Sequence, residues 1–448
     1  MFRQPDSDVF ENIGAQSNRT TQSNVLGVTA LLGGVFFFTG ANALLTTLVV
    51  LKASENGFSS AIIGLLTSSY FAGFILGCQF GGNIVARVGH IRTFAGLAGL
   101  ATICATLYPL APYAAIWLVL RCIGGFAHAI LQMTIESWLT TSTTHERRAS
   151  MISFYRITDL SSVTLIQFAI VFKDISASFL FSVIAILVCL SLLPVVFSKT
   201  TGPAPISRAK PAVLTLARIA PMSVASAFSI GLVSSGFWGL SPIYLSAKGF
   251  GPDVVALFIS AVITGGAIFQ WPVGKFSDHV DRRLVIMGAA LVGAVSCLFL
   301  PIVSGSLYGT LTLGLIYGGA ALPIYALAVS HASDANESDE FVSLAGAVLM
   351  CFGVGAVSGP LIFSIVMQAA GENALFFSIS SVLVLLFAFG MWRRREKAAQ
   401  TADMKEDFII VTRSTPEVFE MDPRSIVAEK QHQPSSEAAE QSVEKFPQ

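Results

Sequence analysis

Charged side chains are scarce in this sequence. Only 12% of its 448 residues are Asp, Glu, Lys or Arg, and 27 basic residues balance 27 acidic ones. A soluble domain carries about 25% charged residues, so this chain has too few to cover a water-facing globule. The zero net charge also removes the electrostatic basis for binding nucleic acid, and we expect no nucleic-acid partner.

Features of metal and nucleotide chemistry are also missing. The six cysteines lie inside apolar runs without metal-ligand spacing, which favours small core residues. No Gly-rich phosphate loop is present, so a nucleotide-driven reaction is not expected. We expect no cofactor, no metal and no enzyme activity. We interpret the one group that resembles a metal site as a solvated acidic loop: His331, Asp334, Glu337 and Asp339.

Apolar runs dominate what remains. The chain is 53% hydrophobic, with a mean hydropathy of +0.70. A membrane-spanning helix needs about 20 apolar residues. Twelve runs approach or exceed that length: 25–51, 61–85, 93–110, 113–137, 150–172, 176–198, 214–245, 254–275, 284–302, 306–330, 341–367 and 373–392. The sequence therefore predicts an all-α membrane protein of 12 transmembrane helices in two pseudo-symmetric six-helix bundles.

The predicted domains follow from these runs. They are an N-terminal arm (1–24), a first bundle (25–198), a linker (199–213), a second bundle (214–392) and a charged tail (393–448). The tail is expected to be disordered, although its apolar patch at 408–411 could dock as a strand. On the side of the termini, the N-terminal arm, the short loops and the segment after the last span hold 17 Lys and Arg residues against three opposite, which predicts cytoplasmic termini in the inner or plasma membrane.

The two bundles repeat at a constant offset. Gly57-Phe58 precedes the second span and Gly249-Phe250 precedes the eighth, while Gly82 and Gly274 end those spans. Both offsets are 192 residues. Internal duplication is common in transporters, where the solute site lies at the interface between the repeats.

The loops after these spans carry a motif. Residues 82–92 read GNIVARVGHIR, which resembles the G-x-x-x-D-R-x-G-R-R signature of the major facilitator superfamily, with Ala86 where the family has Asp. Residues 274–283 keep the acid, Asp278. The resemblance implies that both loops latch the cytoplasmic side. The candidate gate residues are Gly82, Arg87, Gly89, Arg92, Glu136, Gly274, Asp278, Asp281, Arg282 and Arg283.

The resemblance extends over residues 25–392. Residues 121–128, RCIGGFAH, look like the helix-4 motif of the family, and the segments 136–139, 270–274 and 323–327 resemble a bacterial branch usually described as sugar or drug transporters. This implies the major facilitator fold, with the first, fourth, seventh and tenth helices around a cavity.

A polar stripe runs along the fourth span. An Arg or Asp at a helix centre costs roughly 2.5–3.5 kcal/mol on insertion scales, so these side chains must face protein or water. Arg121 is expected to face the cavity, and His128 either titrates or packs. Glu136 is expected to pair with Arg87 or Arg147. The stripe consists of Arg121, Gly125, His128, Gln132 and Glu136.

Arg156, Asp159 and Gln167 share a face of the fifth span. Arg156 and Asp159 could neutralise each other, or Asp159 could carry the coupling proton. Further polar and aromatic residues could line the cavity or pack in the core: Asn42, Gln79, Trp238, Gln270 and Tyr325.

These features predict a monomeric secondary transporter that moves a small organic solute by alternating access, with proton coupling. A passive facilitator and a receptor or scaffold with the same fold stay as alternatives. The intramembrane residues carry one net positive charge, from Arg121 and Arg156 minus Asp159. This charge favours an anionic or neutral solute.

Overall fold

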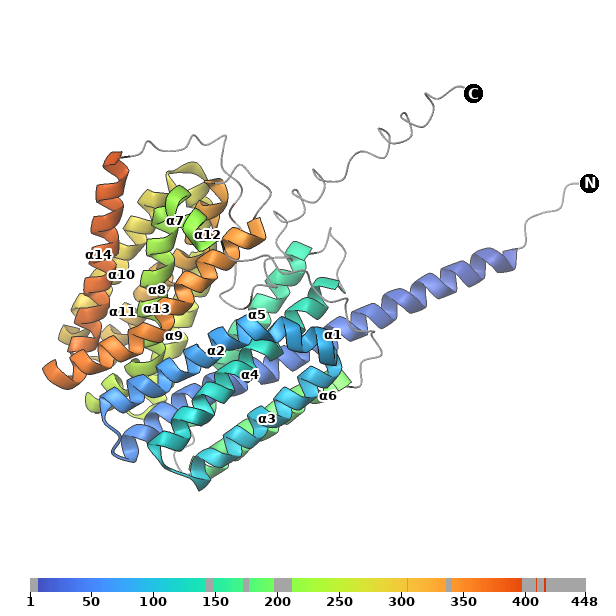
Figure 1. Ribbon diagram of the computed structural model, residues 1–448, viewed down its shortest axis with the longest axis horizontal. Coiled ribbons are helices and arrows are strands. Elements are labelled where there is room, and N and C mark those ends of the chain that lie inside the picture. The colour runs from blue at the N-terminus through green and yellow to red at the C-terminus, as the bar shows by residue number, and fades with distance from the viewer. Residues whose placement is uncertain are drawn as a thin grey trace, which may run out of the picture.

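The structure is a computed structural model that describes residues 7–141, 148–171, 177–196, 212–303, 305–335 and 341–396, together with Phe408 and Thr415. The regular structure within these ranges is helical (Figure 1). The first half contains α1 (Ser7–Glu55), α2 (Ser60–Val88), α3 (His90–Leu110), α4 (Ala114–Thr141), α5 (Arg148–Gln167), the 3₁₀ helix η2 (Phe168–Val171) and α6 (Ala177–Val196).

The second half repeats this order after a short extra helix. It contains α7 (Val213–Ile219), α8 (Pro221–Ala247), α9 (Pro252–His279), α10 (Arg282–Val303), α11 (Leu307–Ala321), α12 (Pro323–Asp334), α13 (Phe341–Ala370) and α14 (Ala374–Glu396). The α11–α12 break falls inside the single predicted run 306–330. Pro323 has no N–H to continue the hydrogen-bond ladder of α11, so it starts a new helix instead.

Ten stretches in the described ranges are long and apolar enough to cross a membrane, with α11 and α12 acting as one. This confirms the predicted all-α membrane fold. The apolar part of α6 is shorter, at Ser178–Pro194, and α5 carries the polar residues Arg156 and Asp159. Counting these two helices would give the predicted twelve, and that number stays a prediction.

The internal duplication is visible in how helices pack. Gly73 of α2 lies against α4, where an added Cβ would sit 1.9 Å from the carbonyl oxygen of Cys122. Gly265 of α9 lies against α11, where the same atom would sit 1.9 Å from the carbonyl oxygen of Leu315. The two glycines are 192 residues apart, the offset read from the sequence. Such backbone contact requires glycine, because any side chain would force the helices apart.

The two halves meet on one side of the molecule. Gly64 of α2 packs on Pro360 and Ser364 of α13, and Gly239 of α8 packs on Thr67 of α2. These contacts lie where α2 begins and α8 ends, which we call the seam side. We call the opposite side, where α2, α4 and α9 end, the termini side. Figure 1 shows the two groups of helices close together at the seam side and diverging towards the termini side.

Candidate functional site

Arg121 is the central residue of the polar stripe on α4. Its side chain is 2% exposed, and its guanidinium lies over the ring of Tyr70 on α2, 4.4 Å from the centroid. It forms no ion pair with any residue in the described part of the chain, and its Nη2 atom has no hydrogen-bond partner there. A cation over an aromatic face is partly stabilised, but the charge of this arginine is not balanced locally.

Three other side chains gather around Arg121. Asn42 of α1 donates through Nδ2 to the hydroxyl of Tyr70 at 3.1 Å. His128 stacks on Phe38 of α1 with centroids 4.8 Å apart, and its Nδ1 atom is buried without a hydrogen-bond partner among the described residues. Arg121 and His128 line one pocket with residues of α1, α2, α3, α4 and α6, including Phe38, Asn42, Tyr70, Cys104, Tyr108 and Ile184.

This pocket is suited to a polar ligand group with negative charge. Arg121 offers N–H donors, and His128 offers a ring nitrogen that can donate or accept. Guanidinium groups bind carboxylates and phosphates through two parallel hydrogen bonds. Aromatic and aliphatic side chains form the rest of the wall, as in most small-molecule pockets. The pocket lies within the first half, beside the helices that face the second half.

The termini-side end of the stripe forms a separate network. Gln132 donates to the hydroxyl of Tyr155 on α5 at 3.0 Å, and that hydroxyl donates to Oε1 of Glu136 at 2.8 Å. Glu136 is wholly buried, and its Oε2 atom accepts a hydrogen bond from Thr415. Sequence reasoning proposed Arg87 or Arg147 as the partner of Glu136. Arg87 is exposed without an ion pair within the described part, and Arg147 lies outside the described residues.

The charged residues of α5 form an ion pair with each other. Nη1 of Arg156 lies 2.8 Å from Oδ2 of Asp159, and the two side chains are 18% and 20% exposed. Arg156 and Asp159 therefore neutralise each other in this structure, which is one of the two alternatives that the sequence left open. Gln167 is buried further along α5, and its Nε2 atom has no hydrogen-bond partner among the described residues. Arg121, by contrast, is a buried arginine without an ion pair in the described part of this half.

The remaining cavity candidates do not join this cluster. Gln79 is exposed on α2. Gln270 and Tyr325 are buried in the second half, and Tyr325 packs edge-on against Phe352 of α13 at 5.4 Å. Trp238 is half-buried and packs edge-on against Phe237. None of these four lines the pocket around Arg121.

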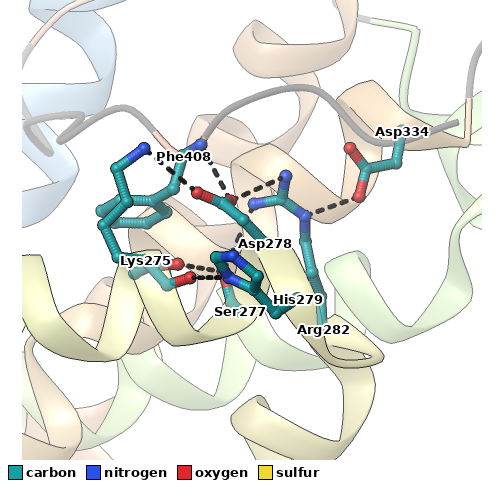
Figure 2. Close-up of polar contacts among 8 residues, drawn as sticks. Lys275, Ser277, Asp278, His279, Arg282, Asp334 and Phe408 are labelled. Carbon is teal, nitrogen blue, oxygen red and sulfur yellow. Dashed lines mark hydrogen bonds and ion pairs between the residues drawn. The ribbon is translucent and has the colours of Figure 1, made fainter. Parts of the chain in front are cut away.

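The loop motif of the second half forms a dense ion-pair network (Figure 2). Arg282, at the start of α10, lies 3.4 Å from Asp278 of α9 through Nη2 and 2.6 Å from Asp334 of α12 through Nε. Lys275 lies 3.5 Å from the other oxygen of Asp278. The side chains of Arg282 and Asp334 are each 1% exposed. The network therefore fastens α9, α10 and α12 together on the termini side.

Asp334 corrects one sequence interpretation. The region around it was expected to be a solvated acidic loop, but α12 extends to Asp334 and places this carboxylate against Arg282. Burial of the pair explains the difference, because each charge compensates the other. Glu337 and Asp339 lie outside the described residues. In the described ranges no group of three potential ligands could hold a metal ion.

Asp281 and Arg283 form a second pair in the same loop. The backbone N–H of Arg283 donates to Oδ1 of Asp281 at 3.0 Å, and Nη2 lies 2.9 Å from Oδ2. Partial burial acts to raise the pKa of Asp281, but the hydrogen bonds and charge of Arg283 outweigh it and leave that pKa below its usual value. The carboxylate therefore stays ionised across the physiological range.

The first-half loop differs from this arrangement. Gly89 adopts a φ of +88°, which makes the tight connection between α2 and α3. Gly82 is half-buried, while Arg87 and Arg92 are exposed and form no ion pair within the described part. His90, the counterpart of Arg282 at the 192-residue offset, is buried and lies 3.2 Å from the hydroxyl of Ser137.

Two residues of the tail complete the termini side; sequence reasoning gave docking of the 408–411 patch as an alternative and did not consider Thr415. The backbone N–H of Phe408 donates to Oδ1 of Asp278 at 2.9 Å, and Thr415 donates to Glu136. Phe408 begins the apolar patch at 408–411 and does dock, while residues 409–411 lie outside the described residues. No motif or periodicity in the sequence marks Thr415 as a contact residue. Tyr70 and Tyr155 were also missed, because single tyrosines in apolar runs resemble core residues.

Comparison with known proteins gives a consistent result. The family model described as Major Facilitator Superfamily matches residues 30–345 and 223–431. An uncharacterized MFS-type transporter, YcaD, of Escherichia coli strain 536 is 25% identical over 368 residues, which cover 79% of this chain and 92% of YcaD. The same protein of strain K12 has the same identity and coverage.

Solved structures share the fold. The nucleoside transporter NupG is 16% identical, with a TM-score of 0.69 over 83% of this chain and 100% of that one. A D-xylose-proton symporter is 17% identical, with a TM-score of 0.65 over 85% of this chain and 99% of that one. At these identities the likeness concerns the fold alone.

Proposed function

Since this chain belongs to the major facilitator superfamily, we propose that it moves a small organic solute bearing an anionic group across the cytoplasmic membrane, with both termini in the cytoplasm. The termini side is then the cytoplasmic side, and a monomer suffices. The observation that supports an anionic solute is Arg121, a buried charge in a pocket without an ion-pair partner in the described part of the chain. Removing such a charge from water is costly unless a partner arrives, and a ligand carboxylate is one.

Alternating access is the proposed mechanism. The halves pack at the seam side and diverge at the termini side (Figure 1), which corresponds to one of the two states such a mechanism needs. A solute that binds one state more tightly than the other shifts the balance between them. Asp159 is the proposed proton acceptor, because its protonation would release Arg156 from the ion pair and leave a second unbalanced positive charge in the first half.

A thermal-shift screen of the purified protein tests the solute class. Small carboxylates are compared with their amides, and a nucleoside and D-xylose are added because two structural neighbours are named for such solutes. At a concentration 100 times Kd, a ligand stabilises by about 2.7 kcal/mol. We expect stabilisation by carboxylates only, lost in Arg121→Gln and kept in Arg394→Gln, a matched change at an exposed arginine of α14. Equal stabilisation by acid and amide would contradict the anionic class.

Uptake into proteoliposomes tests transport and coupling. We expect flux of the identified solute to depend on an imposed pH gradient and to lose this dependence in Asp159→Asn. Passive facilitation is the second candidate, because the closed Arg156–Asp159 pair could serve structure alone. Flux that ignores the gradient in the unmodified protein would favour it. A protein that binds the solute but shows no flux would contradict both.

A further inference from the structure

Two residues of the C-terminal tail are buried at the termini side. Phe408 is 7% exposed and Thr415 is wholly buried. The last helix, α14, ends at Glu396, so both residues lie beyond the membrane-spanning part of the chain. Phe408 contacts α9 in the second half, while Thr415 contacts α4 in the first half. The tail therefore has one anchor on each half.

The Phe408 anchor uses both backbone and ring. Its N–H donates to Asp278, the acid of the loop motif, at 2.9 Å (Figure 2). Its ring lies directly on Gly274 of α9, where an added Cβ would come within 2.1 Å of the ring. The ring can take this place only because residue 274 has no side chain.

The Thr415 anchor uses the carboxylate of Glu136. The Thr415 hydroxyl donates to Oε2, while the Tyr155 hydroxyl donates to Oε1 at 2.8 Å. Hydrogen bonds to an ionised group are roughly twice as strong as neutral ones. Both tail anchors thus end on acids of the candidate gate, Asp278 and Glu136, and Asp278 holds Phe408 while it is also paired with Arg282.

We propose that the tail, held at Phe408 and Thr415, is an autoinhibitory brace that keeps the two halves apart on the termini side. The anchors are seven positions apart in the sequence, so one short stretch of chain has a contact with each half. While both anchors hold, tail residues are packed on α4 and on α9 at the side where the two halves diverge. The brace must leave before the termini side can close. This inference goes beyond the proposed function and depends on it only for the flux measurement.

Distances between spin labels test the brace without any solute. Labels are placed at Val88→Cys and His279→Cys, exposed positions at the ends of α2 and α9, in a protein whose six natural cysteines are replaced. We expect one long distance in the full chain. In Phe408→Ala with Thr415→Val, the ratio of a shorter to the long distance rises about tenfold, the shift that one hydrogen bond to a charged group supports.

Matched variants keep this test decisive. Phe276→Ala removes an equal number of atoms from an exposed site on α9 and should leave the distances unchanged. Gly274→Ala pushes the Phe408 ring away without altering the tail and should reproduce the double variant. A chain ending at Glu396 should do the same. Unchanged distances in the double variant and in Gly274→Ala would overturn the brace.

Flux then tests the inhibitory part. In proteoliposomes with a transported solute, the double variant is expected to raise the initial rate at least about threefold over the full chain and over Phe276→Ala. Changed distances with an unchanged or lower rate would overturn autoinhibition. Because the label distances need no solute, failure of the proposed transport function and failure of the brace remain separate results.

Discussion

The loops that end α2 and α9 occupy equivalent places in the two halves yet are built differently. In the second half, Asp278 and Asp334 enclose Arg282 in a buried network. In the first half, Ala86 stands where Asp278 would be, and His90 replaces Arg282 with a hydrogen bond to Ser137. The difference indicates that ion pairs hold the loop of the second half in place, whereas the loop of the first half depends on a neutral hydrogen bond.

The comparison is most strongly tested by removing the cation of each loop. Arg282→Ala leaves Asp334 buried without its partner and should destabilise by about 3–5 kcal/mol, the cost of breaking a buried pair. His90→Ala should lose about 1 kcal/mol, because a neutral hydrogen bond is lost. Unfolding by SDS, followed by tryptophan fluorescence, measures both. Equal losses would show that the two loops are energetically alike.

Asp278→Asn sharpens the role of the acid. The amide keeps an oxygen for the N–H of Phe408, and Arg282 keeps Asp334. We expect a loss of about 1–2 kcal/mol, since only the charge of one hydrogen-bonded partner is removed. The same unfolding titration applies. An unchanged free energy of unfolding would indicate that the acid at this loop position adds no stability, and that Ala86 at the equivalent position does not destabilise the first half.

The pH dependence of stability distinguishes the loops further. The pKa of Asp281 is lower in the folded protein than in the unfolded chain, so its stabilisation is complete above the unfolded value, about 3.9, and is lost as pH falls through the folded value. The stability gap between the natural protein and Asp281→Asn should be constant from about pH 5 to 8 and narrow below about pH 4. A gap that closes already at pH 6 would contradict the lowered pKa.

The smallest effect is expected from restoring the missing acid. Ala86→Asp places a carboxylate on the exposed last turn of α2, where the basic residues of the loop, Arg87 and Arg92, are also exposed. Exposed ion pairs contribute about 0–1 kcal/mol, so the first half should gain little in the unfolding titration. A gain comparable to the loss from Arg282→Ala would show that one acid suffices to build the network.

Much of the fold could be predicted from the sequence because its causes are local. Apolar runs located the spans, and the 192-residue offset that linked Gly82 with Gly274 also links Gly73 with Gly265 in the packed helices. The stripe on α4 followed from helical periodicity and the cost of charge in lipid. These properties need no knowledge of distant contacts.

What could not be predicted depends on long-range contacts. Arg282 and Asp334 are 52 residues apart, and Glu136 and Thr415 are 279 residues apart. No spacing rule links such positions, so Asp334 was assigned to solvent and Thr415 was not considered. Tyr70 was missed for the same reason, because its role depends on a contact between helices in which the Arg121 guanidinium of α4 lies over its ring.

The seam between the halves has a consequence for how easily they can part. Gly64 of α2 and Gly239 of α8 lie in it, and at these two points less apolar side-chain surface is hidden than larger residues would hide. Hydrophobic attraction scales with hidden apolar area, at about 25 cal/mol per Å². At these glycines, separation of the two halves should therefore expose little apolar surface to water. We expect the free-energy difference between the two conformations to be small enough for the binding of one solute molecule to reverse it.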